Sequence, residues 1–174
     1  RWSKQYLDSE TETIESMNNL IDWLPENLPS EKKTGIVHGD YSLTNVMIGK
    51  NDPNVIAILD WELSTLGDPC ADFNYHCLQY TMNPKLADRE YCKTQGIPII
   101  EDYVKIYSEK INIDLTEEWD LYSAYNLFKL AGILQGILGR VRDGTAAHEN
   151  AAERASGVRN LSDTAWDLVE KNFL

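Results

Sequence analysis

One segment, residues 119–141, constrains the fold most, because it is apolar on nearly every face of a helix. A helix of that kind is buried on all sides, so other elements must surround it. Its longest apolar run, residues 127–138, is interrupted by Lys129 and Gln135 and is too short to span a bilayer. The segment therefore predicts a mostly helical domain built around one central helix, on which Gly132, Gly136 and Gly139 allow close approach of a neighbour.

The composition fits one domain of ordinary size with a true hydrophobic core. The chain has 174 residues, of which 43% are hydrophobic and 10% aromatic, which excludes a disordered acidic tail. Sixteen basic residues stand against 28 acidic ones, so the net charge is −12. This charge argues against a nucleic acid or an anionic membrane surface as the main partner. The oligomeric state does not follow from the composition.

The three cysteines, Cys70, Cys77 and Cys92, form no CxxC pair and no zinc-ligand spacing. An odd number without a framework predicts buried free thiols and an intracellular, reducing compartment. No signal peptide is recognisable. The chain opens at Arg1, in the middle of a polar segment, so we expect it to be part of a longer protein.

The first helix is expected just after Ser9. Residues 9–12 have the form of a capping box, apolar residues then recur at helical spacing up to Leu24, and Pro25 ends the pattern. Residues 25–34 are polar and carry two prolines, so they are interpreted as a linker.

Three short apolar runs follow, at residues 35–37, 46–48 and 55–59, and turn residues separate the last two. This pattern predicts two strands joined as a β-hairpin. From Asp68, the expected helix N-cap, the chain is expected to be helical, with an amphipathic helix over 99–111 and a final helix over 146–173. The fold class is α+β, a small β-hairpin region on a mostly helical domain.

The residues most suggestive of chemistry are grouped around the hairpin. His38, Asp40 and Asn45 lie in the loop between two strands, and Asp60 ends the strand that follows. Hairpin geometry can bring Asn45 and Asp60 side by side. Their amide and carboxylate oxygens are the hard ligands that suit Mg²⁺, which substrate phosphates usually complete. Asp40 faces the same opening and is left free to accept a proton.

The pattern HGDxxxxN at 38–45, an apolar strand ending in Asp60, and then GDPxxD at 67–72 resembles the aminoglycoside phosphotransferase and choline kinase superfamily. Gly39 replaces the arginine of the protein-kinase catalytic loop, and Asp60-Trp-Glu replaces Asp-Phe-Gly, so the chain departs from protein kinases. The string from Ile58 to Pro69 is most similar to the kinase-like domain of acyl-CoA dehydrogenase family members ten and eleven, and the opening residues 1–6 also fit that subgroup.

This resemblance implies an ATP- and Mg²⁺-dependent phosphotransferase acting on a small-molecule hydroxyl. Asp40 would be the catalytic base, and Asn45 and Asp60 would hold Mg²⁺ against the phosphates of ATP.

Supporting roles follow for nearby residues. The resemblance implies that Asp72, in the first turns of the helix, accepts hydrogen bonds from N–H groups of the catalytic loop. His38 is expected to orient the loop rather than carry a proton. Glu62 is either a further metal ligand or a solvated acid.

The sequence elements with which the N-terminal lobe of a kinase binds ATP are not found before the site. No Gly-rich loop and no strand lysine precede the site, and only eleven residues separate Pro25 from Val37. Residues 1–174 are therefore expected to be the C-terminal lobe of a protein-kinase-like fold, without the N-terminal lobe and inactive by themselves.

Two classes of molecule remain possible as the acceptor of the phosphoryl group, one anionic and one cationic. The resemblance implies a hydroxyl on an acyl chain, including one carried on coenzyme A, whereas aminoglycoside or choline acceptors would be cationic. From Lys129 to Arg159 the chain carries five bases and three acids, so Arg140 and Arg142 are candidates to bind an anionic acceptor. The alternative is that these arginines pair with neighbouring acids on an exposed helix.

Two other functions remain open at this point. One is a catalytically inactive kinase fold that only binds a partner, and the other is a metal-dependent hydrolase with Asp40 and Asp60 as paired carboxylates.

Overall fold

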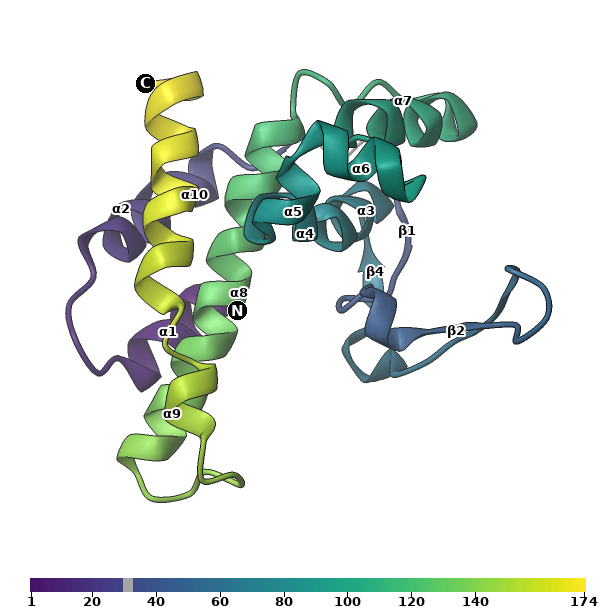
Figure 1. Ribbon diagram of the computed structural model, residues 1–174. Coiled ribbons are helices and arrows are strands. Elements are labelled where there is room, and N and C mark those ends of the chain that lie inside the picture. Colours follow the sequence, from purple (N-terminus) through teal and green to yellow (C-terminus); the bar gives the residue numbers. More distant parts are fainter. Residues whose placement is uncertain (30–32) are drawn as a thin grey trace. The chain divides into compact units, whose positions relative to one another are not determined.

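The computed structural model describes residues 1–29 and 33–174, and these form two compact units (Figure 1). Unit 1 comprises Arg1–Pro29 and Ser123–Leu174, and unit 2 comprises residues 33–122. Three residues of the expected linker, 30–32, lie outside the described part. Within the described residues, no helix is long and apolar enough to cross a membrane.

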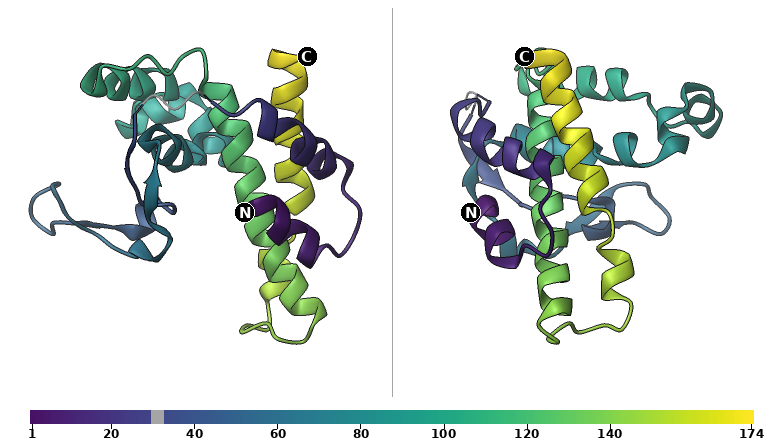
Figure 2. Two further views of the ribbon diagram at one scale, coloured as in Figure 1. Left: turned by 180° about the vertical axis from the view of Figure 1, so that it is seen from behind. Right: turned by 90° about the vertical axis from the view of Figure 1, so that its left-hand side faces the viewer.

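Unit 1 is entirely helical. It contains α1 (Trp2–Ser9), α2 (Glu15–Trp23), most of α8 (Trp119–Arg142), α9 (Ala151–Arg154) and α10 (Val158–Phe173). Helix α10 runs beside α2 and along α8 in the views of Figures 1 and 2. The buried side chains that form this core include Tyr6, Met17, Leu20, Leu127, Ala131, Leu161, Ala165 and Val169.

The predicted long helix is confirmed as α8, and no residue from Leu121 to Gly139 is exposed. Helix α1 packs on its glycine positions, where the Gln5 side-chain amide donates to the carbonyl of Gly132 at 3.1 Å. The buried Gln135 side chain in turn donates to the carbonyl of Ser9 at 2.7 Å. Gln135, one of the polar residues that interrupt this apolar helix, thus connects α8 to α1.

The predicted capping box at residues 9–12 is wrong. Ser9 ends α1, and its hydroxyl donates to the carbonyl of Gln5 at 2.6 Å, so it cannot cap a following helix. Helix α2 begins at Glu15 instead, after Ile14, with no side-chain cap. The sequence pattern does not reveal α1. Ser9, which is the last residue of α1, therefore looked like the start of the next helix.

The predicted final helix is also broken. Residues 146–150 are not helical, and α9 and α10 are separated at residues 155–157. The Ser156 hydroxyl donates to the carbonyl of Glu153 at 2.7 Å, and Gly157 is the N-cap residue of α10. Local hydrogen bonding by serine favours such an interruption.

Unit 2 contains two small antiparallel sheets. The predicted hairpin is confirmed, with β2 (Val46–Ile48) paired to β3 (Val55–Ile58). Strand β1 (Gly35–Val37) pairs with β4 (Thr65–Gly67), which the sequence pattern did not reveal. The loop that holds the candidate site therefore leaves β1 and enters β2.

Five whole α-helices lie in the described part of unit 2, which also includes the first turn of α8. They are α3 (Pro69–Cys77), α4 (Gln79–Met82), α5 (Pro84–Ala87), α6 (Arg89–Gln95) and α7 (Ile100–Ile111). The predicted amphipathic helix is confirmed as α7, whose Tyr107 ring stacks on Phe73 of α3 with 3.8 Å between ring centroids. This aromatic contact fixes α3, the helix that supports the candidate site.

All three cysteines are free and buried in the structure. Burial raises the pKa of the Cys77 thiol to about 12, so this side chain stays protonated near neutral pH. These thiols serve as small apolar packing groups rather than as nucleophiles.

The predicted helix start at Asp68 is confirmed. Its carboxylate accepts from the backbone N–H of Cys70 at 2.9 Å, and Pro69 is the first helical residue. The same carboxylate accepts from the hydroxyl of Tyr122 at 2.6 Å. Burial and this hydrogen bond raise the pKa of Tyr122. One aspartate thus caps α3 and satisfies a buried tyrosine.

We predict that Asp68→Ala lowers the free energy of unfolding by about 2–4 kcal/mol, because the cap contributes about 1 kcal/mol and the Tyr122 hydroxyl would lose its acceptor. Urea denaturation measures the change. The control is Asp88→Ala, since Asp88 caps the exposed helix α6 through Glu90 and Tyr91 and is expected to cost only about 1 kcal/mol. Equal losses in the two variants would contradict the double role of Asp68.

Candidate active site

The loop between β1 and β2 is held to α3 by one carboxylate. Asp72 accepts hydrogen bonds from the backbone N–H groups of His38 and Gly39, the latter at 3.0 Å. Each of its two oxygens receives one of these donors. The start of the loop is thereby fixed to a helix that the aromatic core of unit 2 already holds.

Gly39 is required by the geometry of this loop. Its φ is +85°, which lies in the left-handed region that favours glycine. A Cβ atom at this position would also lie 2.6 Å from the carbonyl oxygen of Leu63. The arginine found here in protein kinases would therefore not fit this chain's loop.

His38 links the loop to the end of β3. Only 3% of the residue is exposed, and its Nε2–H donates to the carbonyl of Leu59 at 2.7 Å. Its Nδ1 accepts from the backbone N–H of Asp40 at 3.2 Å. A ring that donates through one nitrogen and accepts through the other is neutral, and both nitrogens are occupied. These two contacts connect the loop to the end of β3 and to the backbone of Asp40.

Asp40 and Asn45 are in direct contact. The Asn45 Nδ2 donates to the Asp40 Oδ2 at 3.0 Å and to the Asp40 carbonyl at 2.9 Å. With its nitrogen committed in this way, the amide presents its oxygen, Oδ1, as the group available to another ligand. One hydrogen-bonded pair thus couples a carboxylate to a neutral oxygen donor.

Tyr75 is a further contact of Asp40 that sequence reasoning missed. Its hydroxyl donates to the Asp40 carboxylate, and burial together with this negative charge raises the pKa of Tyr75. Tyr75 lies three residues after Asp72 on α3, so both project from one side of the helix. That spacing was the available signal, because Asp72 was already expected to face the loop.

The hairpin brings the backbone of Asp60 close to that of Asn45. Val46 pairs with Ile58, and the backbone N–H of Leu59 donates to the Asn45 carbonyl at 2.8 Å. Asp60 has a left-handed backbone, with φ 66° and ψ 56°, and its side chain is exposed. Aspartate tolerates this conformation better than most residues. An amide oxygen and a carboxylate carried at the same end of a paired hairpin are the kinds of oxygen ligand that Mg²⁺ prefers.

Glu62 lies in the short 3₁₀ turn Trp61–Leu63 and is exposed. In the part of the chain that the structure describes, no three His, Cys, Asp or Glu side chains are close enough to hold a metal ion together. Asp40, Asp60 and Glu62 therefore form no carboxylate cage. The donor set is suited to a metal that takes its remaining ligands from water and phosphate oxygens.

The two candidate acceptor-binding arginines lie near the end of α8, in unit 1, whereas the loop residues belong to unit 2. Arg142 is paired with Asp143, with 2.8 Å between Nε and Oδ1, and it also donates to the carbonyl of Glu10. Arg140 forms no ion pair with any described residue. The two arginines thus differ in whether an anion can reach them without displacing a partner.

The chain matches the model of the phosphotransferase enzyme family over residues 1–122, and it belongs to that family. A solved structure of a Ralstonia eutropha protein, named as a candidate aminoglycoside phosphotransferase, has a TM-score of 0.91 and 42% identity. It is matched over 100% of this chain and 54% of its own length. The fold is therefore the α+β, kinase-like C-terminal lobe that the sequence predicted.

Sequence similarity to two named proteins confirms the resemblance to the acyl-CoA dehydrogenase subgroup. Acyl-CoA dehydrogenase family member 10 of Mus musculus is 38% identical over 176 residues, which is 98% of this chain and 16% of that protein. Family member 11 of Homo sapiens is 33% identical over 99% of this chain and 23% of its own length. The chain thus spans less than a quarter of either relative.

We predict that Asp72→Asn loosens the start of the loop, because an amide nitrogen would face a backbone N–H donor. The loss of one such hydrogen bond is expected to cost about 1–3 kcal/mol locally. Hydrogen exchange should show faster exchange at the His38 and Gly39 amides. Asp102→Asn, on the exposed face of α7, removes the same charge and should leave both amides protected. Unchanged protection in Asp72→Asn would contradict its anchoring role.

Proposed function

We propose that this chain provides the catalytic groups of an enzyme that transfers the γ-phosphoryl group of ATP to a hydroxyl of a small molecule. The observation that supports this most strongly is the hydrogen-bonded pair of Asp40 and Asn45, with Asp60 beside it. The family assignment supports the same class of reaction.

Asp40 is the proposed base. Its carboxylate orients the acceptor hydroxyl and takes its proton as the oxygen forms a bond to the γ-phosphorus. The bond from that phosphorus to the bridging β–γ oxygen breaks, and ADP leaves. Asn45 and Tyr75 both donate to the Asp40 carboxylate and so restrict its rotation. Two donors at one carboxylate favour a well-oriented base.

Asn45 and Asp60 are the proposed ligands of Mg²⁺. When bound, this ion neutralises the charge that develops on the phosphates during transfer. Asn45 would contribute its Oδ1, because its nitrogen is held by Asp40, and Asp60 would contribute a carboxylate that is exposed at the end of the hairpin.

The rest of the ATP cleft is proposed to come from a segment outside these 174 residues. The solved relative is nearly twice as long as the region it shares with this chain. Large apolar side chains are exposed on the strands of unit 2, where Ile36 and Leu66 are 71% and 72% accessible and Val55 and Ile56 also face solvent. Such a group of exposed apolar residues is typical of a surface that another segment covers.

The proposed acceptor is an anionic hydroxy acid or hydroxyacyl thioester, including a coenzyme A thioester, rather than an amine. The names of the relatives, acyl-CoA dehydrogenase family members, favour acyl compounds. The local excess of basic residues around Arg140 favours a negative charge. Of the two candidate arginines, Arg140 has no ion pair among the described residues, whereas Arg142 is already paired with Asp143.

We predict that Asp40→Asn, in the longer protein that carries both lobes, lowers the rate of phosphoryl transfer at least about 100-fold. ATP binding should stay nearly intact, because the substitution removes the proton acceptor and not a metal ligand. A coupled ADP-release assay measures the rate, and calorimetry measures ATP affinity. Near-normal turnover would remove Asp40 from the catalytic role.

We predict that Asp60→Ala abolishes the Mg²⁺ dependence of nucleotide binding, because it removes the charged ligand of the ion. Asn45→Ala should weaken this dependence less, since a neutral amide is the poorer donor. Calorimetric titration with ATP, with and without Mg²⁺, distinguishes the two variants from the unmodified protein. Unchanged affinity for Mg²⁺·ATP in Asp60→Ala would show that the ion is held elsewhere.

A further inference from the structure

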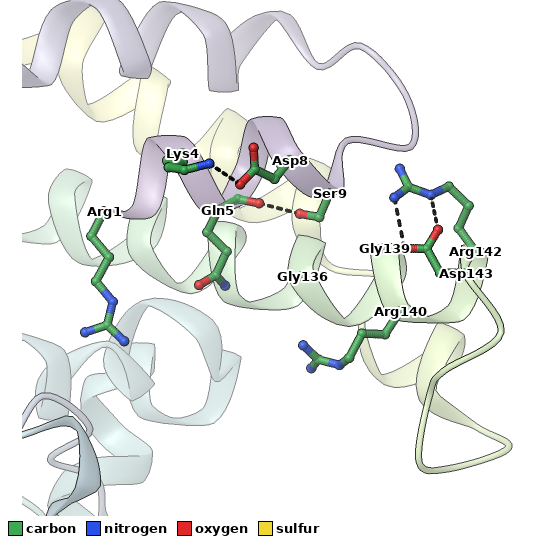
Figure 3. Close-up of a pocket in the computed structure, with 10 residues that line it drawn as sticks. All are labelled: Arg1, Lys4, Gln5, Asp8, Ser9, Gly136, Gly139, Arg140, Arg142 and Asp143. Atoms are coloured by element: carbon green, nitrogen blue, oxygen red, sulfur yellow. Dashed lines mark hydrogen bonds and ion pairs between the residues drawn. The ribbon is translucent and has the colours of Figure 1, made fainter.

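A groove with an excess of basic side chains lies between α1 and the end of α8, within unit 1 (Figure 3). Its volume is about 520 Å³, which is within the usual range for small-molecule sites. The residues that line it are Arg1, Lys4, Gln5, Asp8, Ser9, Gly136, Gly139, Arg140, Arg142 and Asp143.

The two glycines bring the walls of this groove together. A Cβ atom at Gly139 would lie 2.6 Å from the Cβ of Ser9, and one at Gly136 would lie 3.0 Å from the Gln5 Nε2. Larger residues would therefore push α1 away from α8. Because α1 lies this close, Gln5 lies beside Gly136 and Ser9 beside Gly139, with Arg1 toward one end of the groove and Arg140 toward the other.

The charges of the groove do not cancel. It holds four basic residues and two acidic ones, an excess of two positive charges in a chain whose net charge is −12. Lys4 is paired with Asp8 at 2.6 Å, and Arg142 is paired with Asp143 at 2.8 Å. The excess therefore resides on Arg1 and Arg140, neither of which has a carboxylate partner among the described residues.

The side chains that lack ion pairs project in the same direction. Figure 3 shows the guanidinium groups of Arg1 and Arg140 on one side of the two helices, with the Gln5 carboxamide between them. The Lys4–Asp8 pair lies on another face of α1. Arg1 is also held by the Trp2 ring, with its guanidinium carbon 4.7 Å from the ring centroid. Two guanidinium groups and an amide thus face one opening.

We propose that this groove binds a small molecule with at least two anionic phosphate groups, such as a diphosphate. Arginine suits phosphate because its planar group can donate two parallel hydrogen bonds to phosphate oxygens. Two cations at separate places along the groove match separate anionic groups of one extended ligand better than a single compact ion. The groove shares Arg140 with the proposed acceptor site, so the inference rests on the proposed function for that residue, but binding of a diphosphate requires neither Asp40 nor a metal ion.

The test is titration of the protein with pyrophosphate at low ionic strength and without Mg²⁺, followed by calorimetry and by NMR. Saturable binding is expected, with shifts of the Gly136 and Gly139 amides, and inorganic phosphate is expected to bind more weakly than pyrophosphate. Arg140→Gln should lower the pyrophosphate affinity at least about tenfold, since it removes charge-assisted hydrogen bonds to the phosphate oxygens.

Arg142→Gln is the matched control. It removes the same charge two residues away on the same helix, and it leaves Asp143 without its partner, so a general electrostatic effect would weaken binding at least as much as Arg140→Gln does. We expect Arg142→Gln to have a much smaller effect. Equal weakening in the two variants, or no saturable binding, would overturn the proposal.

Asp60→Ala separates this site from the catalytic loop. Pyrophosphate affinity should be unchanged in that variant, because no Mg²⁺ is present and the groove does not include Asp60. A clear gain of affinity in Asp60→Ala, from the loss of a carboxylate that repels the anion, would place pyrophosphate at the catalytic loop and would overturn the inference. Equal affinity for phosphate and pyrophosphate would contradict a ligand with two anionic groups.

Discussion

The candidate site depends on two backbone N–H groups, those of His38 and Gly39, that donate to the single carboxylate of Asp72. This contact joins a loop, which has little regular structure of its own, to α3. The helix is in turn held by the stacking of Phe73 on Tyr107. Because the left-handed Gly39 follows directly, Asp40 leaves this anchor in a defined direction. The orientation of the carboxylate is therefore traceable to the aromatic core of unit 2.

The local parts of the structure could be predicted from the sequence. The hairpin follows from two apolar runs around a turn, the start of α3 follows from Asp68 before Pro69, and α8 follows from its continuous apolar character. Asn45 and Asp60 could be expected to adjoin because a hairpin places its two ends together. For the hairpin and for the start of α3, the decisive interactions lie within about fifteen residues of one another along the chain.

The remaining features depend on contacts that no local pattern records. Strand β4 has three residues and acquires its identity only by pairing with β1, about thirty positions earlier. Tyr75 belongs to the site because its position on α3 places its hydroxyl beside the Asp40 carboxylate. The division into two units arises because residues 1–29 pack with residues after 122, which periodicity cannot show. Ser9 was assigned to the wrong helix because its hydroxyl prefers the preceding turn.

The irregularity in the hairpin has a consequence for how this region tolerates change. Val46 pairs with Ile58 and Met47 with Ala57, but Ile48 pairs with Val55, so β3 carries one extra residue on the side of the turn. The bulge accommodates the extra residue of β3, Ile56, close to the turn. The pairing beside Asn45 and Asp60 therefore stays regular. The turn at residues 49–54 is thereby uncoupled from the site and is the natural place in unit 2 to graft a peptide or attach a probe.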